Sequence, residues 1–153
     1  FLQGFTRALN DDGVATLRFN FSYREAGRKF PDRPPAAIAA WRAAMDFAAA
    51  ESNGEPLWAA GKSFGGRMAS MAVAEGMPAA GLVYLGYPLH PPGKPEKLRD
   101  EHLYGLTLPM LSSKGRAIRS PRLSSWRMLF PASGRPLCCS GWRAAAIPSR
   151  SRA

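Results

Sequence analysis

The sequence predicts an α/β fold with a mostly parallel sheet, because strand-like and helix-like stretches alternate along it. Short apolar stretches of strand length alternate with longer stretches in which apolar residues recur at helical spacing. This alternation favours parallel strands that are joined by crossover helices. With 153 residues and 46% apolar content, the chain is long enough for one domain and too short for two.

Four stretches are expected to form strands, because each is short, apolar and bounded by Gly, Pro, Asn or Asp. They are residues 14–21, 56–60, 81–86 and 106–111.

Four other stretches are expected to form helices. They are residues 1–10, 36–51, 67–75 and the polar segment 96–103. The second of these follows Pro34 and Pro35, which suit the first turn of a helix.

The charge of the chain is unevenly distributed. Residues 1–111 hold 12 Lys or Arg and all 11 Asp or Glu, whereas residues 112–153 hold nine Lys or Arg and no acidic residue. The second segment also has nine serines, four prolines and no sustained apolar period. We therefore expect a folded core at 1–111 and a low-complexity, disordered basic tail at 112–153.

Several classes of protein are disfavoured by the composition. No run of 18 apolar residues is present to span a membrane, and the first residues do not resemble a secretory signal. The adjacent Cys138 and Cys139 cannot build a disulfide framework, which indicates free thiols in a cytoplasmic protein. No His, Cys, Asp and Glu cluster has ligand spacing, so neither a metal nor a cofactor is expected. The sequence does not predict an oligomeric state.

The pentapeptide Gly61-Lys62-Ser63-Phe64-Gly65 lies between a predicted strand and a predicted helix. A Gly-x-Ser-x-Gly sequence in this setting is typical of a nucleophile elbow, in which a strained turn exposes the serine. Ser63 is then the candidate nucleophile, and the backbone N–H of Phe64 is a candidate oxyanion donor. Glycine is expected to be required at the positions of Gly61, Gly65 and Gly66, because a side chain there would keep the strand and the helix apart.

Two other interpretations of this motif were considered. A phosphate-binding loop would need a glycine five residues before Gly61, where Pro56 stands instead. A purely structural strand–turn–helix remains an alternative.

Three runs together resemble a family of small bacterial α/β-hydrolases that are related to dienelactone hydrolases. A eukaryotic branch of the family includes a subunit of a histone-acetyltransferase complex. The runs are GKSFGGRMA at 61–69, LRFNFSYR at 17–24 and GYPLHPPGKP at 86–95, and the resemblance covers about residues 1–111. The resemblance implies a doubly wound, mostly parallel α/β-hydrolase fold, which is incomplete in this chain. It also implies a Ser–Asp–His triad with Ser63 as nucleophile, and a small-molecule ester or acyl substrate.

The sequence departs from this family in three parts. The loop that supplies the second oxyanion donor would precede Phe1, the triad Asp expected after 106–111 is absent, and no His follows His102. His90 is interpreted as a pocket-rim residue and His102 as a solvated one, rather than as replacement bases. We hypothesise that a shift of reading frame directly after Leu111 produced the basic tail and removed the triad partners.

The family's strand order also places a missing strand between 14–21 and 56–60. Without it, both segments would carry unpaired backbone groups, so we expect marginal stability and thermal unfolding below about 60 °C.

Four further residues are candidates for substrate binding. Asn20, Tyr23 and Tyr87 follow the carboxyl ends of predicted strands, where open α/β sheets bind ligands, and His90 lies in the loop that follows Tyr87. Packing within the loops is the alternative for each of them.

The sequence thus predicts a serine hydrolase of the α/β-hydrolase superfamily that acts on an ester or acyl substrate through Ser63 and is impaired in this chain. The alternative is a non-catalytic protein whose basic tail binds nucleic acid, with Trp126 and Trp142 stacking on bases. Nucleic acid is the less favoured partner, because the shift of frame accounts for the basic tail.

Overall fold

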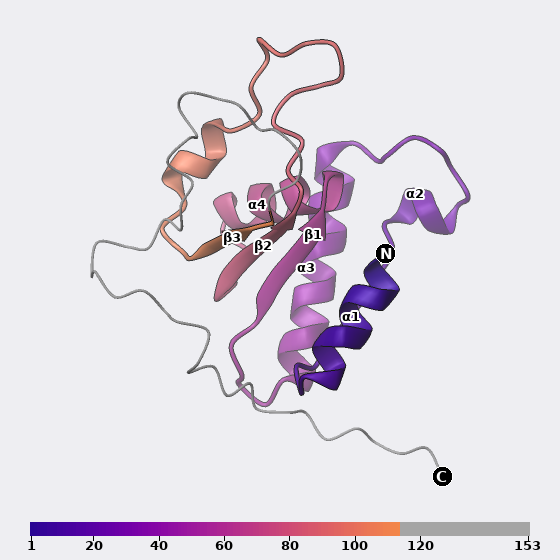
Figure 1. The fold of residues 1–153 in the computed structure, drawn as a ribbon, viewed down its shortest axis with the longest axis vertical. Helices are drawn as coiled ribbons and strands as arrows, with labels where there is room; N and C mark the ends of the chain where they lie inside the picture. The colour runs from indigo at the N-terminus through magenta and orange to yellow at the C-terminus, as the bar shows by residue number, and fades with distance from the viewer. Residues whose placement is uncertain (114–153) are drawn as a thin grey trace.

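The computed structural model describes residues 1–113 of the chain. Residues 114–153 lie outside the described part of the chain. The predictions of a disordered basic tail and of a shifted reading frame fall almost wholly on these residues. Figure 1 shows the course of the chain. The elements are α1 (Leu2–Asp11), α2 (Ser22–Glu25), α3 (Pro34–Glu51), β1 (Trp58–Lys62), α4 (Phe64–Ala74), β2 (Gly81–Leu85), the 3₁₀ helix η1 (Glu101–Gly105) and β3 (Met110–Ser112).

The three strands form one parallel sheet in the order β1-β2-β3. Gly61 of β1 lies opposite Tyr84 of β2, and Leu82 of β2 lies opposite Met110 of β3. The predicted parallel α/β arrangement is therefore confirmed for these strands, although β1 and β3 begin later than the sequence pattern indicates. The strand β3 continues to Ser112, one residue beyond the boundary expected at Leu111.

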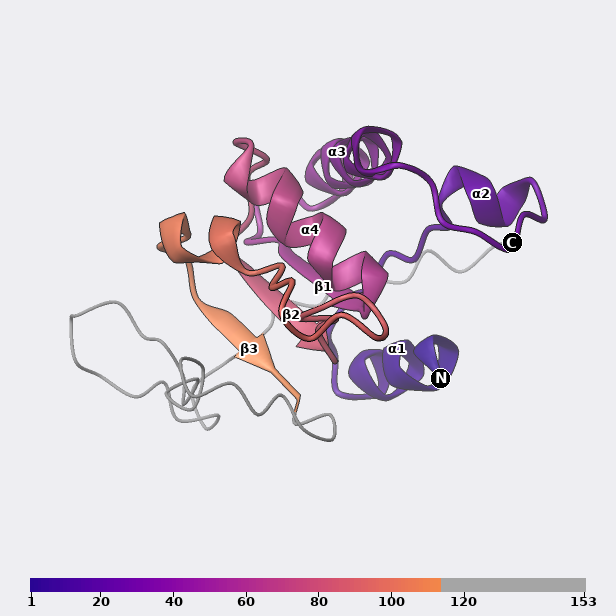
Figure 2. The ribbon, with the colours of Figure 1, turned by 90° about the horizontal axis from the view of Figure 1, so that it is seen from above.

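Helices lie on both sides of the sheet (Figure 2). Seen from above, α3 and α4 cover one face and α1 lies on the other side. The core sits between the sheet and the α3–α4 pair, because the residues buried there come from these elements. They include Ile38, Trp41 and Met45 of α3, Met68, Ala69 and Ala72 of α4, and Leu82 and Tyr84 of β2.

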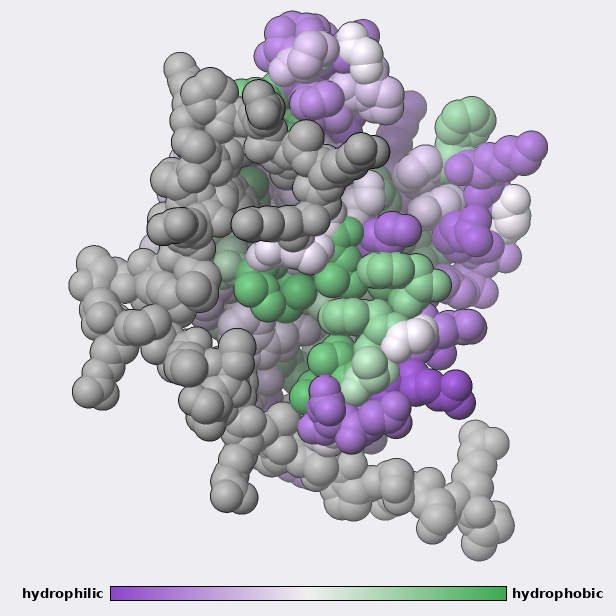
Figure 3. Space-filling model, viewed as in Figure 1, coloured by the Kyte–Doolittle hydropathy of each residue, from purple (hydrophilic) through white to green (hydrophobic). Residues whose placement is uncertain are grey.

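The opposite face of the sheet is less completely covered. Alternation along β2 directs Leu82 and Tyr84, both fully buried, toward α4, and leaves Val83 and Leu85 half-buried on the other side. On this side Leu111 of β3 is 54% exposed. Figure 3 shows apolar side chains gathered in the middle of this face.

The predicted strand at residues 14–21 is wrong. The segment after Val14 is extended and forms no strand ladder within the described part of the chain, and β1 ends the sheet on this side. A lone extended segment cannot pair its backbone groups, whatever its β-propensity. Two of its aromatic side chains nevertheless pack against the helices, whereas Leu17 is 49% exposed. Phe19 meets Trp41 edge-on at 4.9 Å between ring centroids, and Phe21 meets Phe64 at 5.5 Å.

The predicted helix at residues 96–103 is also wrong, since only the short η1 forms there. The backbone around Arg99 is drawn into tertiary contacts that compete with helical hydrogen bonds. Its N–H donates to the carbonyl of Leu89 at 2.8 Å, and its carbonyl accepts from the hydroxyl of Tyr87 at 2.7 Å.

The helices α1, α3 and α4 confirm the other three helical predictions. Pro34 and Pro35 occupy the first turn of α3, where a missing N–H costs nothing. Within residues 1–113, none of the helices combines the length and the apolar character that crossing a membrane requires.

Candidate active site at the turn between β1 and α4

Ser63 occupies a strained position between β1 and α4. Its backbone angles are φ 49° and ψ −113°, a region that residues with a side chain rarely adopt. Two backbone hydrogen bonds hold the turn. The N–H of Ser63 donates to the carbonyl of Gly86, the residue after β2, at 2.9 Å, and the carbonyl of Ser63 accepts from the N–H of Arg67 at 3.1 Å. Such a strained turn presents a serine side chain above the carboxyl edge of a parallel sheet.

The glycines around Ser63 are not equivalent. A Cβ on Gly61 would lie 2.6 Å from the Cα of Gly66 and closer still to its nitrogen, and a Cβ on Gly66 would lie 2.7 Å from the carbonyl oxygen of Gly61. These two glycines therefore let strand and helix touch. A Cβ on Gly65 would meet only the ring of Phe21, at 3.7 Å, which is an ordinary contact. The expectation that Gly65 must also lack a side chain is therefore wrong.

The hydroxyl of Ser63 is exposed and has no hydrogen-bond partner in the region 1–113. Phe64 is the first residue of α4, so its N–H has no acceptor within the helix and lies at the positive end of the helix dipole. An exposed hydroxyl beside a free backbone donor is the minimum arrangement for attack on a carbonyl carbon.

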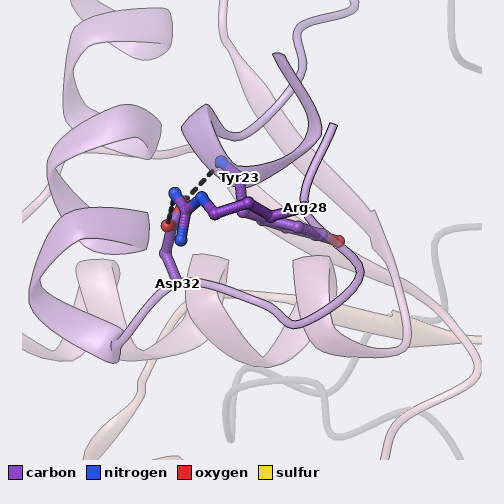
Figure 4. Close-up of polar contacts among 3 residues, drawn as sticks. All are labelled: Tyr23, Arg28 and Asp32. Carbon is purple, nitrogen blue, oxygen red and sulfur yellow. Dashed lines mark hydrogen bonds and ion pairs between the residues drawn. The ribbon is translucent and has the colours of Figure 1, made fainter. Parts of the chain in front are cut away.

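Tyr23 is brought to this turn by the loop that carries α2. Its N–H donates to Asp32 Oδ2 at 2.9 Å, and Asp32 also forms an ion pair with Arg28 at 2.6 Å (Figure 4). The Asp32 side chain is only 7% exposed, so a buried carboxylate holds this loop in place through its bonds to Arg28 and Tyr23. The Tyr23 ring lies edge-on to Phe64, with 6.3 Å between centroids. Of the four binding candidates, Tyr23 is in ring contact with the nucleophile turn.

Asn20 and His90 make local contacts instead. The amide of Asn20 donates to Glu25 Oε1 at 2.7 Å, and both side chains are exposed. His90 is exposed in its loop, where Nδ1 lies 3.1 Å from the carbonyl oxygen of its neighbour Pro91. The structure brings neither residue into contact with Ser63.

Tyr87 is placed beside the site but is turned inward. It follows Gly86, which accepts the hydrogen bond from Ser63, and it is 8% exposed. Its hydroxyl donates to the carbonyl of Arg99 at 2.7 Å, and burial raises its pKa to about 12. The phenol therefore stays protonated at neutral pH and cannot serve as a base there.

A family model described as an alpha/beta hydrolase domain matches residues 1–118. The chain belongs to the α/β-hydrolase family. The match agrees with the strained serine between a strand and a helix, which is a defining feature of these hydrolases. No curated protein and no solved structure matches the chain significantly.

His102 of this α/β-hydrolase contacts a different serine from the candidate nucleophile. Its Nε2 lies 2.8 Å from the hydroxyl of Ser70, one turn further along α4 from Arg67. The Ser70 hydroxyl also donates to the carbonyl of Arg67, at 2.8 Å. Ser70 is fully buried and cannot reach a substrate. The prediction that His102 is a solvated residue is wrong, because η1 packs it half-buried against α4.

Sequence reasoning missed the polar cluster around His102. It comprises Arg67, Ser70, Tyr87, Arg99 and Asp100, which join α4 to the end of β2 and to η1. Tyr87 was among the predicted binding residues, and Arg67 and Ser70 could have been found from the sequence, because they are spaced three residues apart on α4 and share the helix face that follows Ser63. Arg99 and Asp100 are brought to these residues by the loop after β2, whose path the sequence does not indicate.

We expect His102 to make the stability of the chain depend on pH. Burial, followed by the positive charge of Arg67, lowers its pKa against the opposing effects of Asp100 and Glu101. Between the lowered pKa and the ordinary value of about 6.5, the unfolded chain binds the proton more readily than the folded chain. The contribution of neutral His102 to the free energy of unfolding is therefore complete above about pH 6.5. The free energy of unfolding falls as the pH is lowered below that value.

Urea unfolding at pH 7.5 and pH 5.5 measures this effect. The decrease between the two pH values should be smaller in His102→Gln than in the wild-type chain, and His90→Gln should behave as wild type. At pH 7.5, His102→Gln should cost no more than about 1 kcal/mol, the worth of one hydrogen bond. An equal decrease in the wild type and in His102→Gln would contradict the assignment.

The site has no cluster of metal ligands. Within residues 1–113, no group of three or more His, Cys, Asp or Glu is placed to hold an ion.

Proposed function

We propose that this chain is a serine hydrolase in which Ser63 attacks the carbonyl carbon of a small ester or acyl substrate. The observation that carries the proposal is the backbone of Ser63, which combines φ 49° and ψ −113° with an exposed side chain. A strained conformation costs about 1–3 kcal/mol and persists where the surrounding structure enforces it, as at many active sites. Here Gly61 and Gly66 permit it by letting β1 and α4 touch.

In the proposed step, the oxygen of Ser63 forms a bond to the substrate carbonyl carbon while its proton passes to solvent water, and the carbonyl π bond opens to an oxyanion. The oxyanion then collapses and expels the alcohol, which takes up a proton from water, and a second water molecule hydrolyses the acyl-serine to the acid and free Ser63. The N–H of Phe64 donates a hydrogen bond to that oxyanion, aided by the dipole of α4. The family resemblance of residues 1–111 to hydrolases related to dienelactone hydrolases supports a small substrate over a polymeric one.

Activation of Ser63 needs a base that the described residues do not provide. His90 is turned to Pro91, and His102 is bonded to Ser70. We therefore propose that the chain as it stands reacts slowly, because loss of a member of a catalytic triad typically lowers the rate by several orders of magnitude.

A fluorophosphonate probe tests the proposal, because it reacts with a nucleophilic serine much faster than with an ordinary surface serine. The full chain should be labelled slowly and at Ser63, as peptide mapping by mass spectrometry would show. Ser63→Ala should abolish the labelling, whereas Ser22→Ala, which removes an exposed hydroxyl from α2, should leave it unchanged. Equal labelling of the wild-type chain and Ser63→Ala, or none in either, would rule out a nucleophilic Ser63.

A further inference from the structure

Three aromatic rings form a cluster that begins at the nucleophile turn. The ring of Phe64, the residue directly after Ser63, lies 5.5 Å from the ring of Phe21 and 6.3 Å from the ring of Tyr23, between centroids. Phe21 and Tyr23 are stacked, with 6.3 Å between their centroids and 17° between their planes. Consecutive Cα atoms are about 3.8 Å apart, so the cluster starts beside the candidate nucleophile. We call Phe21, Tyr23 and Phe64 the aromatic wall.

The aromatic wall is only partly covered by the rest of the molecule. All three of its residues are half-buried. Phe21 and Phe64 pack with one side against the hydrophobic core, whereas Tyr23 does not pack against the core in the described part of the chain. The hydroxyl of Tyr23 forms no hydrogen bond with any residue of 1–113. Tyr23 therefore has ring surface and a polar group that are free for another molecule.

The backbone of Tyr23 is nevertheless held firmly. Its N–H donates to Oδ2 of Asp32 at 2.9 Å, and Oδ1 of Asp32 is paired with Arg28 at 2.6 Å (Figure 4). The carbonyl of Tyr23 accepts from the N–H of Arg28 at 2.8 Å. A side chain whose backbone is already fixed loses less conformational freedom when a ligand binds, which favours recognition.

The geometry of the aromatic wall suits a planar partner. Aromatic rings attract each other in offset-stacked and edge-to-face arrangements with centroids about 4.5–7 Å apart. The wall presents both orientations, because Phe64 stands at 73° to Phe21 and at 89° to Tyr23, while those two rings are nearly parallel. A further ring can therefore stack on one member and meet another edge-on. A saturated group of the same size gains burial but not these ring contacts.

We propose that the aromatic wall binds an aromatic acyl group of the ester substrate, with Tyr23 as the specificity-determining residue. This inference rests on the proposed hydrolase function, and it adds the class of substrate. In a benzoyl-type ester the ring is bonded directly to the carbonyl carbon that Ser63 attacks, which matches a wall that starts one residue from Ser63. Asp32 is a positioning residue, because it holds Tyr23 against Phe64 without belonging to the wall.

Binding, rather than turnover, tests the aromatic wall. The full chain carrying Ser63→Ala would be titrated with methyl benzoate and with methyl cyclohexanecarboxylate, which carry the same ester on an aromatic and on a saturated six-membered ring. Ligand-observed NMR would give both dissociation constants. The aromatic preference is defined as the dissociation constant of the saturated ester divided by that of methyl benzoate. Comparing this ratio between variants cancels the difference in hydrophobicity between the two esters.

Substitutions assign the aromatic preference to Tyr23. Tyr23→Leu, in the Ser63→Ala background, should lower the preference about 2- to 10-fold, because leucine is apolar but has no ring. Tyr23→Phe keeps the ring and should keep the preference. Phe30→Leu is the matched control, since it removes an 84% exposed ring from the loop that follows α2 and should change nothing.

The positioning role of Asp32 has its own test. Asp32→Ala should lower the aromatic preference although Asp32 contributes no ring, because the N–H of Tyr23 loses its acceptor. Asp32→Asn keeps an acceptor oxygen and should restore most of the preference. An unchanged preference in Asp32→Ala would overturn the positioning role. If circular dichroism shows Tyr23→Leu to be unfolded, nuclear Overhauser effects between the ring protons of Tyr23 and methyl benzoate carry the test of the wall.

The results separate the aromatic wall from the hydrolase function. The same aromatic preference with and without Tyr23→Leu, or no measurable binding of methyl benzoate, would overturn the wall and leave labelling of Ser63 untouched. Ring-dependent binding in a chain whose Ser63 does not react with fluorophosphonate would support the wall while the hydrolase proposal fails.

Discussion

Gly61→Ala should destabilise the chain by about 3 kcal/mol, the upper end of the usual range for overpacking. The added Cβ would lie 2.6 Å from the Cα of Gly66 and closer to its nitrogen. Both of these are backbone atoms in the first turns of α4, so the clash cannot be relieved by a change of rotamer. The strand and the helix would have to separate, and the angles of Ser63 would change with them. Urea unfolding followed by circular dichroism would measure the loss.

Gly65→Ala is the matched control for this prediction. It introduces the same methyl group four residues later, but its Cβ would meet only the ring of Phe21, at 3.7 Å. Alanine also has a higher helix propensity than glycine by about 1 kcal/mol, and Gly65 lies within α4. Gly65→Ala should therefore be neutral or slightly stabilising. Equal stability of Gly61→Ala and Gly65→Ala would show that the close approach of β1 and α4 is not required.

Trp41→Ala should cost about 3–5 kcal/mol, the usual range for removing a large buried aromatic side chain. Trp41 of α3 is 7% exposed and packs edge-on against Phe19 at 4.9 Å. Its indole Nε1 donates to the carbonyl of Gly65 in α4, at 3.0 Å. One side chain thus joins α3, the first turn of α4 and the extended segment that lacks a strand partner. Thermal unfolding and urea unfolding would both report the loss.

Trp41→Phe separates the two contributions of this residue. Phenylalanine keeps most of the apolar volume and the ring contact with Phe19, but it leaves the carbonyl of Gly65 without its donor. The expected cost is about 1–3 kcal/mol, which is that of a buried acceptor left unpaired. A cost in Trp41→Phe as large as that in Trp41→Ala would show that the hydrogen bond to Gly65, rather than the packing, stabilises this region.

The uncovered edge of β1 bears on the marginal stability that the sequence predicts. Residues 14–21 supply aromatic side chains to the core but no strand, and β1 ends the sheet. Backbone groups that are left unpaired must be satisfied by water or remain a cost. Thermal unfolding of the full chain remains the measurement for this prediction, with a transition below about 60 °C expected.

Local sequence determined much of the candidate site. The elbow could be predicted because its requirements are confined to neighbouring residues: a serine that tolerates strain, a preceding apolar strand, and the contacting pair Gly61 and Gly66. The helix α3 could be predicted for a similar reason, since its proline start and its apolar spacing are both local signals.

Only the tertiary structure decided the features that depend on a distant partner. Residues 14–21 have the composition of a strand but no neighbour to pair with, and residues 96–103 lose their helix because Arg99 pairs with Leu89 and Tyr87. His102 meets Ser70 across more than 30 residues of chain. Hydrogen bonds and charges act over a few ångströms in space, so a linear pattern indicates which groups are present but not which of them meet.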